Sequence, residues 1–227
     1  MAEAFTLQDA QSLSDLSTYL GRAARVEDGS VRLIASGGIL AVYVAVLYPA
    51  GLLDESPTVL GLRTFSLPDG EEFDTVVPVA SLLNRIERAK TEIVDDAAPA
   101  RVALPLSAPS VTWAAISPPR GGWSPLAGPS TAALDAIARA GIDEVATAIP
   151  TGTGEAIVHK VRSQVWGRPL EGFDYIPAGA GFAAVSLGFL GDSADEPVKV
   201  FETGPWTRLS TPRGHVLVKR RAWSLAR

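Results

Sequence analysis

The amino-acid sequence predicts an α+β fold with largely antiparallel sheets and a central helical segment. Runs rich in β-branched residues gather in residues 31–67 and 198–220, and mainly helical periodicity lies between them. Strands and helices therefore do not alternate as they would around a parallel sheet. With 47% hydrophobic and 20% charged residues in a chain of 227, the composition is that of a globular protein. We expect one domain over residues 1–227, with an alternative boundary near residues 95–100.

The first half of the chain carries clear helix and strand signals. Leu13, Leu16 and Leu20 recur at helical spacing. Ser36, Gly37 and Gly38 separate two apolar runs and predict a hairpin turn. The elements expected here are a helix over residues 12–26, strands over 31–35, 39–48 and 58–67, a helix over 79–93, and short strands over 101–106 and 110–116.

The second half is expected to begin with helices and end with strands. Ser130 is a suitable N-cap for a helix over residues 131–140, and Gly141 is a suitable residue to end it. A separate short helix over residues 142–149 would then stop at Pro150. The remaining elements are a helix over 154–166, an ambiguous segment over 173–177, a glycine-studded apolar run over 179–190, and strands over 198–202, 206–211 and 215–220.

Charge and composition exclude several classes of function. The net charge is −5, whereas proteins that neutralise phosphates usually carry a basic domain or patch, so we expect no nucleic-acid partner. The absence of cysteine excludes disulfides, iron–sulfur clusters and thiol catalysis. The most apolar run, residues 39–48, is half the length of about 20 residues that a spanning helix needs, so we expect no membrane association. A polar, acidic N-terminus then predicts a cytoplasmic protein.

The sequence offers few residues for catalysis or metal binding. The chain has two histidines, His159 and His215, and no ligand spacing typical of zinc. His159 would share a helix face with Arg162, Ser163 and Trp166, which could bind a ligand or simply face water. We find no complete catalytic set, favour a protein that is not an enzyme, and expect no cofactor and no metal ion.

One glycine-rich segment supports an alternative function. Residues 179–184 read G-x-G-x-x-A, the dinucleotide-binding fingerprint, and Glu202 follows Gly181 at the distance of a ribose-binding acid. Gly179, Gly181 and Glu202 would then bind a nucleotide. The competing interpretation is a tightly packed apolar segment whose glycines allow close backbone approach. Pro177 and the short chain after Glu202 favour this second interpretation.

Tryptophan and arginine occur together three times beside glycine or proline. Such residues are enriched at binding hot spots, although a tryptophan in this setting can also fill the core under a loop, with arginine covering it. We predict that at least four of the six residues line one cleft or face, where they would bind an anionic ligand. Together with His159, the candidate ligand-binding residues are Arg120, Trp123, His159, Trp166, Arg168, Trp206 and Arg208.

Two short motifs, Pro118-Pro-Arg-Gly-Gly-Trp123 and Val165-Trp-Gly167, resemble an uncharacterised group of proteins from high-GC Gram-positive bacteria. The resemblance covers about 50 residues by the spacing of the motifs and implies no chemistry. The resulting hypothesis is a cytoplasmic, non-catalytic binding or interaction protein that forms a homo-oligomer and binds an anionic small molecule or partner. The alternative is a nucleotide- or dinucleotide-binding enzyme that uses residues 179–184.

Overall fold

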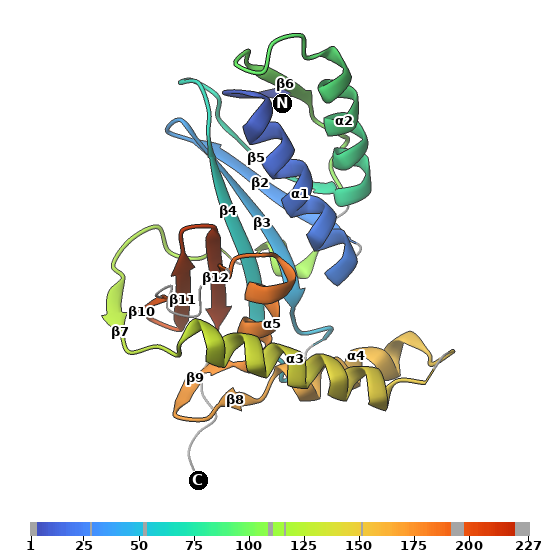
Figure 1. Cartoon of the computed structure of the whole chain (residues 1–227), viewed down its shortest axis with the longest axis vertical. Helices are drawn as coiled ribbons and strands as arrows, with labels where there is room; N and C mark the ends of the chain where they lie inside the picture. The colour runs from blue at the N-terminus through green and yellow to red at the C-terminus, as the bar shows by residue number, and fades with distance from the viewer. Residues whose placement is uncertain are drawn as a thin grey trace. The chain divides into compact units, whose positions relative to one another are not determined.

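The computed structural model describes residues 4–27, 29–51, 54–108, 111–115, 117–150, 152–191 and 198–220. The chain forms two compact units. The first unit contains Met1–Ala45 and Leu62–Ile116, and the second contains Val46–Gly61 and Ser117–Arg227. Their helices and mostly antiparallel strands confirm the predicted α+β class (Figure 1). The prediction that residues 1–227 fold as a single domain stays a prediction.

The first unit has a sheet with two helices packed beside it (Figure 1). Its hydrogen-bonded strands lie in the order β5-β2-β3-β4, and β1 pairs with β6 in a separate two-stranded sheet. Strands β3 and β4 also supply residues 46–47 and 58–61 to the second unit. The elements are β1 (Ala4–Leu7), α1 (Ala10–Val26), β2 (Ser30–Ser36), β3 (Ile39–Leu47), β4 (Thr58–Ser66), β5 (Phe73–Pro78), α2 (Val79–Glu92), β6 (Ala100–Ala103) and a 3₁₀ turn, η1 (Thr112–Ala115).

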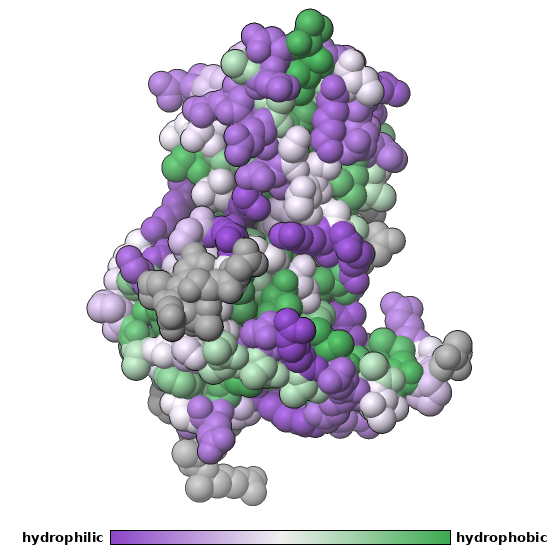
Figure 2. All heavy atoms as spheres, in the orientation of Figure 1, coloured by the Kyte–Doolittle hydropathy of each residue, from purple (hydrophilic) through white to green (hydrophobic). Residues whose placement is uncertain are grey.

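The core of the first unit follows from the periodicities of its strands and helices. Val31, Leu33 and Ala35 alternate along β2 and are buried, as expected for a sheet with one covered face. The Tyr19 hydroxyl of α1 donates a hydrogen bond of 3.3 Å to the Val42 carbonyl of β3. Burial raises the pKa of this hydroxyl well above its usual value, so Tyr19 stays protonated. Hydrophilic side chains lie over α1 and α2 on the outer face (Figure 2).

The second unit combines an antiparallel sheet with three helices. Its strands lie in the order β4-β12-β11-β10-β7, and β8 pairs with β9 in a short hairpin. Helix α5 packs against α3, α4 and β12. The elements are β7 (Ser124–Leu126), α3 (Thr131–Ala148), α4 (Glu155–Trp166), β8 (Pro169–Leu170), β9 (Phe173–Pro177), α5 (Ala178–Ser186), β10 (Lys199–Thr203), β11 (Trp206–Thr211) and β12 (Gly214–Lys219).

Three predicted elements are wrong, two helices and one strand. The helices expected over 131–140 and 142–149 are one helix, α3, because Gly141 lies inside it and leaves room for the Trp166 ring. Residues 112–115 of the strand expected over 110–116 form a 3₁₀ turn, while residues 110 and 116 lie outside the described residues. In that turn the Ala114 carbonyl accepts a hydrogen bond of 2.6 Å from Arg32 Nη1. This tertiary contact overrides the local preference of a β-branched run.

The structure also shows the secondary structure of segments that the sequence left ambiguous or did not predict. Residues 173–177 form β9, and the glycine-studded run begins as helix α5. Four strands were not expected, and all are short or polar: β1, β5, β7 and β8. Residues 95–99, near the alternative boundary, lead into β6 within the first unit. Among the described helices, none is both long and apolar enough to cross a bilayer.

Candidate functional site

An open cleft of about 610 Å³ lies in the second unit between residues 54–57 and helix α4. We call it the α4 cleft. Its volume lies within the range of about 300–1,000 Å³ that is typical of small-molecule sites. Its polar and charged lining comes from two segments about a hundred residues apart in the sequence, and includes Asp54, Ser56, His159, Lys160, Ser163 and Arg168.

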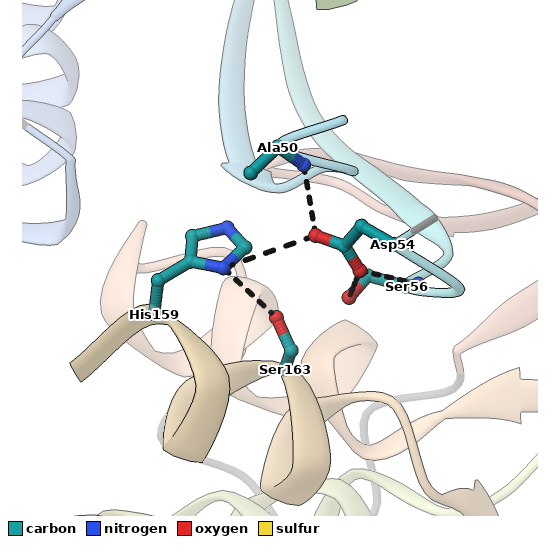
Figure 3. A network of polar contacts seen from close by, with 5 residues as sticks. All are labelled: Ala50, Asp54, Ser56, His159 and Ser163. Carbon is teal, nitrogen blue, oxygen red and sulfur yellow. Dashed lines mark hydrogen bonds and ion pairs between the residues drawn. The ribbon is translucent and has the colours of Figure 1, made fainter. Parts of the chain in front are cut away.

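Asp54 organises one wall of the α4 cleft (Figure 3). Its Oδ1 accepts hydrogen bonds from the Ser56 amide at 2.9 Å and the Ser56 hydroxyl at 2.6 Å, and its Oδ2 accepts one from the Ala50 amide at 2.8 Å. Burial alone would raise the pKa of Asp54, but these hydrogen bonds and the nearby His159 outweigh it and lower the pKa. Asp54 is therefore a carboxylate whose charge fixes its own loop.

His159 faces this wall from α4 through a single ring nitrogen (Figure 3). Its Nδ1 lies 3.4 Å from Ser163 Oγ and 3.8 Å from Asp54 Oδ2. In a catalytic triad the base contacts the nucleophile through one nitrogen and the carboxylate through the other. Here both oxygens face the same nitrogen, so Asp54, His159 and Ser163 are not arranged as a triad. The imidazole can accept or donate a hydrogen bond to a ligand through Nε2.

Arg168 is the second residue after α4 and lines the same cleft. Its Nη1 and Nη2 each donate a hydrogen bond of 2.7 Å to the Glu144 carboxylate of α3. These bonds raise the pKa of Arg168 and lower that of Glu144. The bidentate geometry fixes the guanidinium in place. The structure thus brings two of the predicted ligand-binding residues, His159 and Arg168, to one cleft.

A second pair of predicted residues, Trp123 and Arg208, meets elsewhere in this unit. The Arg208 guanidinium carbon lies 4.5 Å from the centre of the Trp123 ring and 4.8 Å from that of Phe201. We call these three residues the Arg208 cluster. Trp123 belongs to the loop before β7, where its Nε1 donates a hydrogen bond of 3.2 Å to the Pro119 carbonyl. Arg120, in the same loop, is exposed.

The remaining two tryptophans belong to the core. Trp166 is 2% exposed and stacks on Phe182 at 4.3 Å between ring centres. Trp206, at the start of β11, is 4% exposed. The six paired tryptophans and arginines therefore scatter: two meet, one lines the α4 cleft, two are buried and one is exposed, namely Trp123 with Arg208, then Arg168, then Trp166 and Trp206, then Arg120. The expectation that four of the six would line one cleft is not met. Sequence spacing could not reveal this, because loop length does not fix which way a tryptophan side chain points.

The candidate nucleotide-binding glycines are packed inside helix α5. Both Gly179 and Gly181 are buried. A Cβ at Gly179 would lie 3.0 Å from the Trp166 carbonyl oxygen, and one at Gly181 would lie 2.9 Å from the Leu134 carbonyl oxygen. Glu202 lies on β10, where it is 3.4 Å from Arg220. This arrangement favours the competing interpretation, in which the glycines allow neighbouring backbones to approach closely.

Sequence reasoning missed Asp54 and Phe201 as candidate site residues. The Asp54-Glu-Ser56 stretch is a typical Asx-turn sequence and could have been read as an ordered loop. Phe201 gave no signal, because its position opposite Arg208 depends on the register of β10 and β11. Among the described residues, no group of three or more histidine, aspartate or glutamate side chains is placed to hold a metal ion.

Two family models match separate parts of the chain. Residues 1–105 match a domain of unknown function (DUF8010), and residues 118–223 match another (DUF8185). The interval between these matches contains residue 116, where the first unit ends. No curated protein matches the sequence. The resemblance to proteins of high-GC Gram-positive bacteria stays a prediction.

Similar solved structures include bacterial DNA polymerase sliding clamps. The clamp of Pseudomonas aeruginosa is 14% identical with a TM-score of 0.46, and the match covers 99% of this chain and 65% of the clamp. The clamp of Caulobacter crescentus is 15% identical with a TM-score of 0.47, covering 98% and 67%. A putative DNA polymerase III β subunit from Eubacterium rectale is 8% identical with a TM-score of 0.49, covering 99% and 66%. This chain thus spans about two thirds of the length of these proteins.

These comparisons correct one expectation. The exclusion of a nucleic-acid partner is wrong, because the similar structures are named as clamps of DNA polymerase. The net charge of −5 was the reason for that exclusion. A net charge is a sum over the whole chain, whereas binding of a polyanion depends on where the basic side chains lie. The two family models that match the chain describe domains of unknown function, over residues 1–105 and 118–223.

Proposed function

We propose that this chain is a non-catalytic binding protein whose second unit binds an anionic ligand or an anionic group of a partner in the α4 cleft. The observation that carries the proposal is the placement of three basic side chains on one side of a cleft of about 610 Å³. His159, Lys160 and Arg168 all come from α4 or the residues directly after it.

The opposite wall carries two carboxylates, Asp54 and Glu55, so we expect the anion to lie toward α4. The Asp54 carboxylate already accepts three hydrogen bonds from its own loop, so its charge is partly compensated. Lys160 is exposed and available to a ligand, and Glu144 holds Arg168 in position. An anion in the cleft would meet donors that are already oriented, which lowers the entropy cost of binding.

The geometry around His159 favours binding over catalysis. Its Nδ1 faces both Ser163 and Asp54, so the ring cannot take a proton from the serine while the aspartate stabilises the other nitrogen. The same ring can still hydrogen-bond a ligand through Nε2. We therefore assign His159 to ligand recognition.

The absence of cysteine allows a direct test. Gln164→Cys places a single thiol in the α4 cleft, and Gln11→Cys places one on α1 in the first unit; both glutamines are exposed. Each variant is labelled with the same environment-sensitive fluorophore and titrated with citrate, ATP and a short DNA duplex. We expect at least one of these anions to change the emission at position 164 but not at position 11.

A charge-removing variant links the signal to the cleft. Lys160→Gln in the Gln164→Cys background should weaken the binding of the anion that changes the emission by about two- to fivefold, because a single exposed ion pair contributes roughly 0.2–1 kcal/mol. The proposal fails if none of the three anions changes the emission at position 164, or if the label at position 11 responds equally.

A further inference from the structure

The Arg208 cluster joins three segments of the second unit around one guanidinium. Phe201 and Arg208 lie directly opposite each other on β10 and β11. Trp123 immediately precedes β7, which pairs with β10 on its other side. Both rings lie within about 6 Å of the guanidinium, the range in which cation–π attraction acts. The sheet therefore holds Arg208 against two aromatic rings.

The charge of Arg208 is not balanced by an acid in the described part of the chain. Among the described residues, no oxygen accepts a hydrogen bond from its guanidinium, and its Nε is buried without a partner. His215 on β12 lies close enough to interact electrostatically with Arg208: burial first and Arg208 second lower the pKa of His215, so it is neutral near pH 7. Glu202, beside Phe201, lies 3.4 Å from Arg220. Burial also lowers the pKa of Arg208 itself.

The chemistry of this arrangement fits an oxyanion. Arg208 is half-buried, and its buried Nε has no hydrogen-bond partner. Partial burial of an unpaired cation costs free energy, and two aromatic rings compensate only part of that cost. Ring contacts occupy the faces of a guanidinium, whereas its in-plane N–H groups are suited to the two oxygens of a planar carboxylate. A phosphate carries about −1.5 to −2 charges at pH 7, which is more than one arginine neutralises.

We infer that the Arg208 cluster binds a carboxylate group through the free N–H groups of Arg208, with Trp123 and Phe201 holding the guanidinium. None of these three residues lines the α4 cleft, so this site goes beyond the proposed function. The carboxylate belongs either to a free acid or to an acidic side chain of a partner protein, and both sources present the same group to Arg208.

Nuclear magnetic resonance of the ¹⁵N-labelled chain tests this site. Trp123→Phe assigns the indole N–H signal of Trp123, and Arg208→Lys assigns the Nε–H signal of Arg208. N-acetylglycine supplies a free carboxylate, and N-acetylglycinamide is the matched neutral probe. We expect the acid, but not the amide, to move both signals in a saturable manner. A Gly-Glu-Gly peptide capped at both ends presents a side-chain carboxylate, and comparison of its affinity with that of N-acetylglycine identifies the source.

Three substitutions test whether binding needs the Arg208 guanidinium itself or only the positive charge of the protein. Arg208→Gln should weaken N-acetylglycine binding tenfold or more, as expected for the loss of charge-assisted hydrogen bonds. Arg88→Gln changes the net charge equally at an exposed position on α2 and should bind as the wild type does. Arg208→Lys keeps the charge without the planar fork, so it should also bind more weakly. If Arg208→Gln does not fold, as its spectrum will show, Arg208→Lys decides the test.

Several outcomes would overturn the inference. They are the absence of any shift with either carboxylate probe, equal shifts with the neutral amide, full affinity in Arg208→Lys, or tighter binding of inorganic phosphate than of N-acetylglycine. Because the fluorophore at position 164 reports on the α4 cleft alone, failure of one site is distinguishable from failure of the other.

Discussion

Gly141 shows how the lack of a side chain at one position allows two helices of the second unit to pack. It lies inside α3, and the Trp166 ring occupies the space where a Cβ would be. Trp166 in turn stacks on Phe182 of α5 and is 2% exposed. A Cβ at residue 141 would lie 2.3 Å from the Trp166 ring, so the absence of a side chain there is a condition for this contact.

Replacing this glycine tests the packing directly. Gly141→Ala should destabilise the protein by about 1–3 kcal/mol, the usual cost of overpacking, even though alanine is the better helix former. Gly21→Ala in α1 is the matched control, because no atom lies within 4 Å of the new Cβ; it should be neutral or stabilising by roughly 0.4–1 kcal/mol. Urea unfolding of both variants measures the difference, and equal midpoints would contradict the packing argument.

Asp54 predicts a pH dependence of stability. Hydrogen bonds from its loop, which outweigh burial, lower its pKa in the folded state. Its charge therefore stabilises the fold above the unfolded pKa of about 3.9, and that stability is lost as the pH falls through the lower folded value. Asp54→Asn should be less stable than the wild type by roughly 1–2 kcal/mol at neutral pH, with a gap that closes below about pH 4.

Urea denaturation of both proteins between pH 3 and 7 measures this gap. Glu92→Gln removes one charge at an exposed position on α2 and controls for the change in net charge. A gap between the wild type and Asp54→Asn that is as large at pH 3 as at pH 7 would show that the carboxylate charge contributes nothing.

At the scale of elements, capping side chains define where helices α1 and α3 begin. Ser130 Oγ accepts a hydrogen bond of 3.2 Å from the Ala133 amide at the start of α3. Asp9 does the same for α1, accepting a hydrogen bond of 2.7 Å from the Ser12 amide. These side chains satisfy amides that have no partner within the helix. Both helices then present an apolar face to a neighbouring helix, α2 or α5.

The cap of α3 can be tested by substitution. Ser130→Ala should cost about 1 kcal/mol, whereas Ser130→Asp should retain most of the stability because a carboxylate also accepts the amide hydrogen bond. Ser14→Ala, at an exposed position inside α1, is the control and should be neutral or slightly stabilising. Thermal unfolding of the three variants gives the ranking. Equal losses in Ser130→Ala and Ser130→Asp would argue against a capping role.

At the scale of the whole molecule, the two units are not continuous in sequence. Val46–Gly61 belongs to the second unit although it lies within the first half of the chain. It supplies Val59 and Leu60, which are buried, and the strand next to β12. A fragment of residues 117–227 should therefore be unfolded, because it lacks a sheet neighbour and part of its core. A cooperative thermal transition of that fragment, followed by circular dichroism, would contradict this prediction.

Homo-oligomerisation stays a prediction at this scale. Several apolar side chains are exposed in the described residues, including Leu106 at 91% and Ile157 at 58%, and Figure 2 shows apolar side chains on the surface of α3 and α4. Burial of such groups between copies would be favourable. Sedimentation equilibrium should show a species larger than one chain, and a monomer at high micromolar concentration would count against it.

The sequence alone determined the fold class and most of the secondary structure. The leucines of α1, the alternation of β2 and the Gly37-Gly38 turn are local signals, because each depends on periodicity or on backbone freedom within a few residues. The strands β10, β11 and β12 followed from the same signals. His159, Arg168, Trp123 and Arg208 were also recognised from residue type and neighbourhood.

Only the tertiary structure decided which of these residues meet. Gly141 by its residue type favours the end of a helix, and the sequence cannot show that Trp166 occupies the space beside it. The pairing of Arg208 with Phe201 depends on strand register, and the pairing of His159 with Asp54 joins positions about a hundred residues apart. Such contacts are fixed by the packing of the whole chain, which local spacing does not encode.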